Sequence, residues 1–197
     1  LELPPESAPL LVQLALHVSR WAERLNLTAH RSAEAVARRL ILDAIALGRA
    51  LPESPPSSIA DLGSGAGFPG LPLAILWPAC RVTLVDSRER RHHFQRSAIR
   101  ELTLSNVEAL RGRAESVLHE PHQIAIAQAM AQPSIALAWL RDWVAPAGWI
   151  VLPLSQSQSA DGPPIEAPEG VIQAETRSYD VPLGGPRRTL WIGRRSP

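Results

Sequence analysis

A glycine-rich segment between two apolar runs constrains this chain more than any other feature. The first apolar run ends at Asp61, glycines follow at Gly63, Gly65 and Gly67, and a helix-compatible segment comes next. Glycine in such a strand-to-helix turn lets a ligand approach the backbone closely, because no Cβ stands in the way. The second run ends at Asp86, 25 positions after Asp61, where a carboxylate can hold the two hydroxyls of a ribose. Together these segments predict a nucleoside-cofactor pocket at the carboxyl edge of a parallel sheet.

From residue 58 onward the chain alternates strand-like and helix-like patterns. Strands are expected near 58–62, 81–86, 106–110, 123–128 and 148–153, and helices near 69–76, 88–101, 114–118 and 133–144. Strands separated by helical stretches indicate a parallel sheet that is covered on both faces. A Gly-Gly turn between 179–182 and 189–192 predicts a terminal β-hairpin. The polar stretch 155–168 predicts a flexible loop.

The N-terminal part of the chain reads as a helical extension. Apolar residues recur every three or four positions from Pro9 to Leu25. A second periodic stretch begins after Ser32, a suitable N-cap, and runs to about Ala50. A Pro- and Ser-rich linker follows. We therefore expect a helical extension at 1–52 and an α/β domain at 53–197.

Charge and cysteine content narrow the class of protein. All 20 basic residues are Arg and the net charge is only +1, so total charge does not point to nucleic acid, although eight Arg fall between positions 81 and 113. The single cysteine, Cys80, favours a cytoplasmic protein without an intrachain disulfide. No apolar run approaches the roughly 20 residues of a membrane span. His92 and His93 lack a third ligand at suitable spacing, so we expect neither membrane nor metal.

The glycine loop is compatible with two classes of cofactor. The stretch 65–70 formally matches the dinucleotide pattern G-x-G-x-x-G, with Asp86 in the place of the ribose acid. S-adenosylmethionine is favoured because Asp61 would repel a pyrophosphate, an extra upstream glycine widens the turn, and the terminal hairpin is typical of Rossmann-like methyltransferases. A purely structural interpretation makes Asp61 a cap for the following turn and Asp86 an N-cap for the next helix.

Further residues carry a family resemblance. The stretch 21–28 is similar to the W-N-x-x-x-N-L-T signature of the bacterial 16S ribosomal RNA guanine-N7 methyltransferases, the glucose-inhibited division protein B family. The similarity continues through 39–43, 61–70, 86–91 and 112–115, and fades at 179–182. It implies a Rossmann-like class I S-adenosylmethionine-dependent methyltransferase with a mostly parallel sheet, N-terminal helices and a C-terminal β-hairpin. It also implies 16S ribosomal RNA or the small ribosomal subunit as the substrate. We further expect a monomer in the cytoplasm.

The resemblance implies a set of cofactor-binding residues. Gly63 and Phe68 would contact the cofactor in the glycine turn, and Ala114 and Glu115 match the adenine-pocket positions of the family. The full expected set is Asp61, Gly63, Ser64, Gly65, Gly67, Phe68, Asp86, Ser87, Ala114, Glu115 and Gln128.

Three residues are expected on the substrate side. Asn26 and Thr28 would lie near the mouth of the site, although both also fit a loop tied by its own side-chain hydrogen bonds. Asp43 is a candidate acceptor beside a cationic guanine product, or else an exposed helix acid. Guanine N7 carries a lone pair and no proton, so its methylation needs alignment rather than a general base.

Three positions depart from the family pattern. Gln128 stands where the family has Arg, Pro153 where it has Lys, and Leu40 where it has His. These departures leave two alternatives open. One is a non-catalytic paralogue that binds RNA or the ribosome, and the other is a methyltransferase with a different acceptor.

Overall fold

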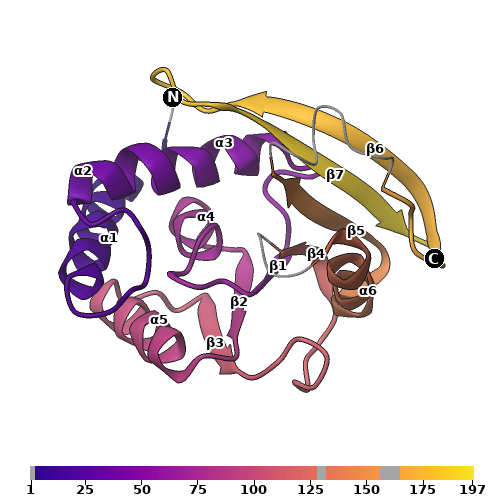
Figure 1. Ribbon diagram of the computed structural model, residues 1–197, viewed down its shortest axis with the longest axis horizontal. Helices are drawn as coiled ribbons and strands as arrows, with labels where there is room; N and C mark the ends of the chain where they lie inside the picture. The colour runs from indigo at the N-terminus through magenta and orange to yellow at the C-terminus, as the bar shows by residue number, and fades with distance from the viewer. Residues whose placement is uncertain (1–2, 128–131, 156–164) are drawn as a thin grey trace.

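A seven-stranded sheet forms the centre of the computed structural model, which describes residues 3–127, 132–155 and 165–197 (Figure 1). The strands are β1 (Ser58–Leu62), β2 (Arg81–Asp86), β3 (Val107–Arg111), β4 (His122–Ala127), β5 (Val144–Leu154), β6 (Val171–Asp180) and β7 (Arg187–Arg195). Their order across the sheet is β3-β2-β1-β4-β5-β7-β6. The first five are parallel, and β7 runs antiparallel to both β5 and β6. The expected Rossmann-like sheet with a C-terminal hairpin is confirmed.

Helices cover both faces of this sheet. They are α1 (Ser7–Ala22), α2 (Ala33–Val36), the π-helical η1 (Ala37–Ile41), α3 (Leu42–Ala50), α4 (Gly70–Leu76), α5 (Glu89–Glu101) and α6 (Pro133–Trp143). Ser32 caps α2 as expected, because its Oγ accepts a hydrogen bond of 3.1 Å from the backbone N–H of Ala35. Within the described ranges, no helix is long and apolar enough to cross a membrane.

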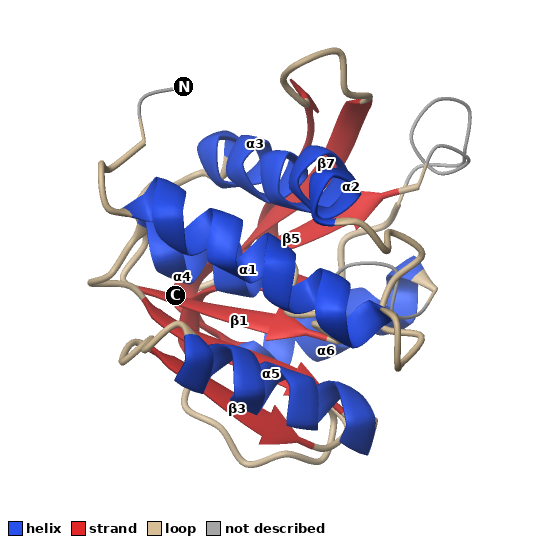
Figure 2. Ribbon diagram, turned by 90° about the vertical axis from the view of Figure 1, so that its left-hand side faces the viewer, coloured by secondary structure: helices blue, strands red, loops and turns tan. Residues whose placement is uncertain are grey.

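Two hydrophobic cores hold these layers together. One core lies between the sheet and the helices α1, α3, α4 and α5, and the other lies under α6. Figure 2 shows α1 and α5 in front of the strands and α6 behind them. Strand β1 serves both cores, because Ile59 faces the first and its neighbours Ala60 and Leu62 face the second. Strand β1 is completely buried and lies between β2 and β4. The glycine turn that follows it therefore lies inside the sheet edge rather than at its end.

The structure corrects three expected elements. Residues 114–118 form a turn rather than a helix, because only Ser116 and Val117 donate back to the Arg113 carbonyl before the chain leaves toward β4. Strand β6 begins at Val171 instead of near 179; its residues at 172–176 are all exposed, so this edge strand has no alternating apolar pattern. Strand β5 begins at residue 144, earlier than the expected 148.

Candidate functional site

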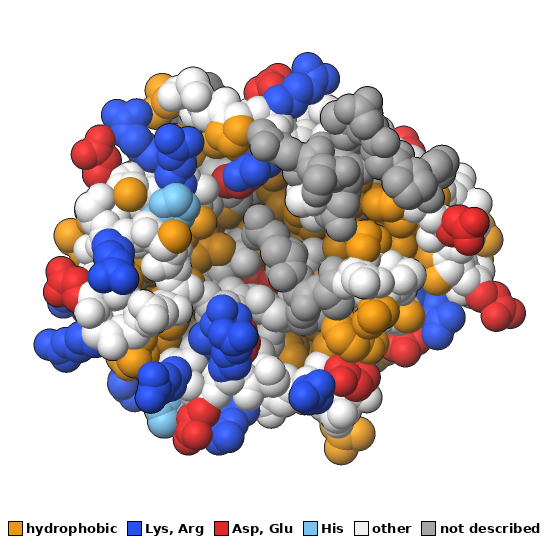
Figure 3. All heavy atoms as spheres, viewed as in Figure 1, with side chains coloured by type: hydrophobic (Ala, Val, Ile, Leu, Met, Phe, Trp, Pro, Cys, Tyr) orange, Lys and Arg blue, Asp and Glu red, His pale blue; other side chains and the backbone are white. Residues whose placement is uncertain are grey.

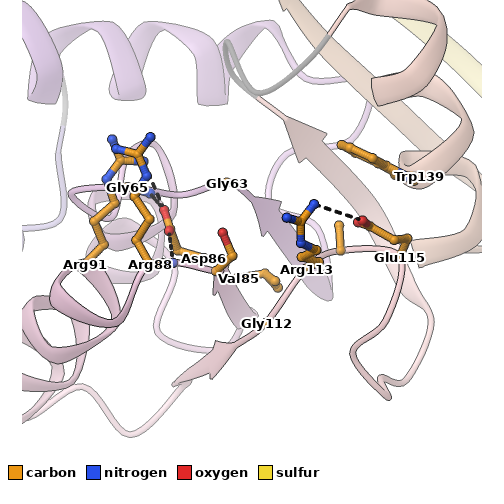
Figure 4. A pocket seen from close by; sticks show the side chains of 12 residues that line it. Gly63, Gly65, Val85, Asp86, Arg88, Arg91, Gly112, Arg113, Glu115 and Trp139 are labelled. Carbon is orange, nitrogen blue, oxygen red and sulfur yellow. Dashed lines mark hydrogen bonds and ion pairs between the residues drawn. The ribbon is translucent and has the colours of Figure 1, made fainter.

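A cavity of about 470 Å³ opens beyond the carboxyl ends of β1, β2 and β3. Figure 4 shows residues from these three strand ends and from α6 around it. The lining residues are Gly63, Gly65, Val85, Asp86, Ser87, Arg88, Arg91, Gly112, Arg113, Ala114, Glu115 and Trp139. Ligands of open α/β sheets bind in this position, and the volume falls within the range of small-molecule sites.

The glycine loop wraps around the end of β2. The backbone N–H groups of Gly63 and Ser64 both donate to the Val85 carbonyl, at 2.8 and 3.0 Å. The φ values of Gly63, Gly65 and Gly67 are 71°, 56° and 78°. Residues other than glycine rarely adopt this left-handed region. A Cβ built on Gly65 would have no neighbour closer than 3.8 Å, so this backbone is open toward the cavity. The loop therefore leaves the backbone at Gly65 uncovered beside the cavity.

Asp86 ties the loop to the start of α5. Its Oδ2 accepts hydrogen bonds from the Gly65 N–H at 3.0 Å and from Arg91 Nη1 at 3.3 Å, and its Oδ1 accepts one from the Arg88 N–H at 2.9 Å. A carboxylate offers about four lone-pair positions, so these three bonds leave capacity for a ligand hydroxyl. Ser87 follows it in the cavity wall and is exposed.

Asp61 lies beneath the loop and is not part of the cavity wall. It is fully buried, and its Oδ2 accepts a 2.9 Å hydrogen bond from the N–H of Gly70, the first residue of α4. Its Oδ1 has no hydrogen-bond partner among the described residues. Burial raises the pKa of Asp61 to about 7, with the Gly70 bond opposing this and the negative charge of Asp86 adding to it. The capping bond that the sequence allowed is therefore present.

The opposite wall is formed by the loop after β3 and by α6. Ala114 and Glu115 line the cavity, and an ion pair with a 3.8 Å contact joins Glu115 to Arg113. The carbonyl of Ala114 accepts a 2.9 Å hydrogen bond from Nε1 of the fully buried Trp143, which anchors this wall to α6. Trp139 contributes an aromatic surface beside Glu115 (Figure 4).

The remaining residues expected at the site lie apart from this cavity. Asn26 is exposed. Thr28 Oγ1 accepts a 3.2 Å hydrogen bond from the His30 N–H, as expected if the loop is tied by its own side-chain hydrogen bonds. Ser64 is buried behind the loop and bonded to Val85. Gly67 packs so closely on Leu71 that a Cβ would come within 2.3 Å of it.

The positions that depart from the family pattern also lie outside the cavity wall or outside the described chain. Gln128 is outside the described residues. Pro153 is in β5 and pairs with Leu190 of β7, beyond the last paired residue of β4. This place suits a residue without an N–H donor.

Asp43 is buried, not exposed, and it connects three elements. The Tyr179 hydroxyl donates to its Oδ1 at 2.7 Å and Arg188 Nε donates to its Oδ2 at 3.1 Å. Burial, followed by the charge of Asp43, raises the pKa of Tyr179, so its phenol remains a donor. A small cleft beside Asp43 is bordered by Leu40 and Phe68. Phe68 therefore faces α3 rather than the large cavity.

Three residues of this site were not assigned from the sequence. Gln95 is fully buried and its Nε2 donates to Ser64 Oγ at 2.9 Å and to the Gly65 carbonyl at 3.0 Å. Arg91 pairs with Asp86, and Trp139 of α6 lines the cavity. Trp139 packs partly against the second core, and only the tertiary structure shows the opening next to it.

The sequence is similar to one family of known proteins. The GidB family model, described as "rRNA small subunit methyltransferase G", matches residues 7–162. A "Ribosomal RNA small subunit methyltransferase G" of Chromohalobacter salexigens is 34% identical over 188 residues, which cover 95% of this chain and 87% of that protein. One from Clostridium botulinum (strain ATCC 19397 / Type A) is 31% identical over 173 residues, covering 85% and 68%.

Solved structures show the same fold at lower identity. The apo form of the S-adenosylmethionine-dependent methyltransferase SibL superposes with a TM-score of 0.63 at 16% identity, covering 95% of this chain and 70% of that chain. A SAM-dependent methyltransferase from Aquifex aeolicus gives 0.58 at 16% identity, covering 82% and 93%. These likenesses concern the Rossmann-like fold alone.

Proposed function

The chain belongs to the GidB family of rRNA small subunit methyltransferases G, and from this membership we propose that it transfers a methyl group from S-adenosylmethionine to N7 of a guanine in 16S ribosomal RNA. The observation that carries the proposal is the cavity that lies between the glycine loop with Asp86 and the wall formed by Ala114 and Glu115. We propose that the protein acts as a monomer in the cytoplasm, on the RNA or on the small subunit.

The residues around the cavity fit an adenosyl cofactor. Asp86 has acceptor capacity for a ribose hydroxyl, and the open backbone at Gly65 leaves room for a close approach. Ala114, Glu115 and the indole of Trp139 offer the mixed apolar and polar surface that an adenine ring needs. When bound, the cofactor supplies an electrophilic methyl group on a sulfonium that leaves as a neutral thioether.

The task of the protein is then alignment. Guanine N7 needs no deprotonation, so the side chains of the site have to orient the two reactants and exclude water. We place Asp43 on the acceptor side, where its buried carboxylate next to Phe68 would stabilise the cationic product electrostatically. Asn26 and Thr28 are proposed to border the same entrance.

Two measurements test the proposal. Calorimetric titration with S-adenosylhomocysteine should give saturable binding, and labelled S-adenosylmethionine should donate its methyl group to unmodified 16S ribosomal RNA or small subunits. Mapping by chemical cleavage at N7-methylguanine should then find a single site. Absence of binding at millimolar S-adenosylhomocysteine would refute the proposal that the protein is a methyltransferase. Transfer of the label to another acceptor would refute the proposal that ribosomal RNA is the substrate.

A further inference from the structure

Two exposed arginines stand at one end of α5, beside the mouth of the cavity. Arg88, the N-cap of α5, lines the cavity, and Arg90 follows within the first turn. Both are exposed, and neither forms an ion pair within the described part of the chain. On the face shown in Figure 3, Arg side chains stand on the left of the hollow and apolar side chains on the right.

Each neighbouring carboxylate is already engaged by another cation. Asp86 pairs with Arg91 at 3.3 Å, Glu89 with Arg111 at 3.4 Å, and Glu115 with Arg113 at 3.8 Å. These acids therefore leave the charges of Arg88 and Arg90 uncompensated.

The cofactor does not explain this surplus of positive charge. S-adenosylmethionine carries a sulfonium, an ammonium and one carboxylate, so its net charge is positive, and nearby free arginines do not favour it electrostatically. An exposed guanidinium instead matches phosphate, which it binds with two parallel hydrogen bonds. The chemistry of Arg88 and Arg90 thus points to a second, anionic ligand that approaches the same opening.

We propose that Arg88 and Arg90 bind backbone phosphates of the RNA beside the target guanine. This inference rests on the proposed function. Arg90 lies one helical turn before Phe94, whose ring contacts Trp21 of α1 at 5.7 Å between centroids. Arg90 therefore lies on the side of α5 that faces the end of α1, from which the Asn26–Thr28 loop departs. The pair extends from the cavity toward that loop, a path along which a phosphate backbone can run.

The same helix supplies a matched control. Arg96 and Arg100 are also exposed and without an ion pair in the described structure, but they lie on the outer side of α5, away from the cavity. We compare Arg88→Gln/Arg90→Gln with Arg96→Gln/Arg100→Gln, since both double variants lose the same charge. Binding to transcribed, unmodified 16S ribosomal RNA is measured by filter retention from 50 to 300 mM salt, and S-adenosylhomocysteine binding by calorimetry.

The proposal predicts that loss of these arginines weakens RNA binding much more than binding of the cofactor product. The Arg88/Arg90 variant should bind RNA roughly tenfold more weakly, with a slope of log affinity against log salt reduced by about 1.5, since each lost phosphate contact removes about 0.7 to 0.9. The single variant Arg90→Gln should bind S-adenosylhomocysteine within about twofold of the wild type, because Arg90 does not line the cavity. The Arg96/Arg100 variant should keep most of its RNA affinity.

Equal RNA affinities and salt slopes for the two double variants would overturn the proposal, and so would a loss of S-adenosylhomocysteine binding in Arg90→Gln. Failure of the proposed function is a different result, in which the wild type binds RNA but neither binds the cofactor product nor transfers methyl groups.

Discussion

Asp86 is the residue on which most of the proposed cofactor site depends. Its two oxygens hold the N–H of Gly65 in the loop, the N–H of Arg88 at the start of α5 and the guanidinium of Arg91. Replacing the carboxylate by an amide keeps its shape but removes the charge and turns one acceptor into a donor that faces N–H groups. A hydrogen bond to a charged group contributes roughly 1.5–3 kcal/mol.

We expect Asp86→Asn to weaken S-adenosylhomocysteine binding by about 10- to 100-fold in calorimetry, on the basis of that energy. Glu89→Gln is the control, because Glu89 is an exposed acid three positions later that pairs with Arg111 and does not line the cavity. Wild-type affinity in Asp86→Asn would show that the carboxylate does not bind the ligand.

Among individual residues, sequence predicted the backbone features of the site better than its side-chain contacts. The glycines and Asp86 were found because a strand end followed by glycine is a local pattern. The Gln95 bonds to Ser64 and Gly65 were not found, since they join residues 30 and 31 positions apart. Such contacts depend on how α5 packs against the loop, and a single sequence does not encode that in its periodicity.

The buried acid of α3 connects this helix to the C-terminal hairpin. Asp43 is 8% exposed and is held by Tyr179 of β6 and Arg188 of β7. Tyr179→Phe leaves one carboxylate oxygen without its donor, which we expect to lower the free energy of unfolding by about 1–2 kcal/mol. Asp43→Asn should cost a similar amount, because Arg188 loses its counter-charge.

Urea denaturation of Tyr179→Phe, Asp43→Asn and the double variant measures this connection. The double variant should lose less stability than the sum of the single losses, because both changes break the same bond. Ser178→Ala, an exposed neighbour on β6, is the control and should change stability by less than about 0.5 kcal/mol. Strict additivity of the two changes would contradict the connection.

At the scale of elements, prediction succeeded where a pattern is both long and buried on one or both faces. Strands β1 and β2 and helix α5 lie within a residue or two of their expected positions, because their apolar runs or periods are strong. The helix expected at 114–118 failed because a five-residue stretch cannot repay the cost of helix nucleation. The π-helical turn at Ala37–Ile41 left no sequence signal, since it adds one residue to an otherwise regular helical period.

Two buried groups give the whole molecule opposing responses to pH. Burial, with a smaller contribution from Arg81, lowers the pKa of His122 to about 4, whereas burial raises the pKa of Asp61 to about 7. Between pH 4 and 6.5 the unfolded chain protonates His122 more than the folded chain does, so this group makes stability rise with pH. In the same range the folded chain holds the extra proton on Asp61, so this group makes stability fall with pH.

We therefore expect the two contributions to cancel in part, and single substitutions to separate them. Over pH 4–6.5, Asp61→Asn should make the rise of unfolding free energy with pH steeper than in the wild type, and His122→Gln should make it shallower. Each difference has a limit of about 1.4 kcal/mol per pH unit. Denaturant titrations at five pH values measure the slopes, and three parallel curves would contradict the assignment.

The continuity of the first core has a consequence for cooperativity. Leu14 and Val18 of α1 belong to the same buried cluster as Leu73 of α4 and Ile59 of β1, so no plane of weak contact separates the N-terminal helices from the sheet. Deleting the N-terminal helices would expose the apolar outer side of α4 to water, and this apolar patch would promote aggregation. The chain should accordingly melt in a single transition, and a shortened version should yield aggregate rather than a smaller working enzyme.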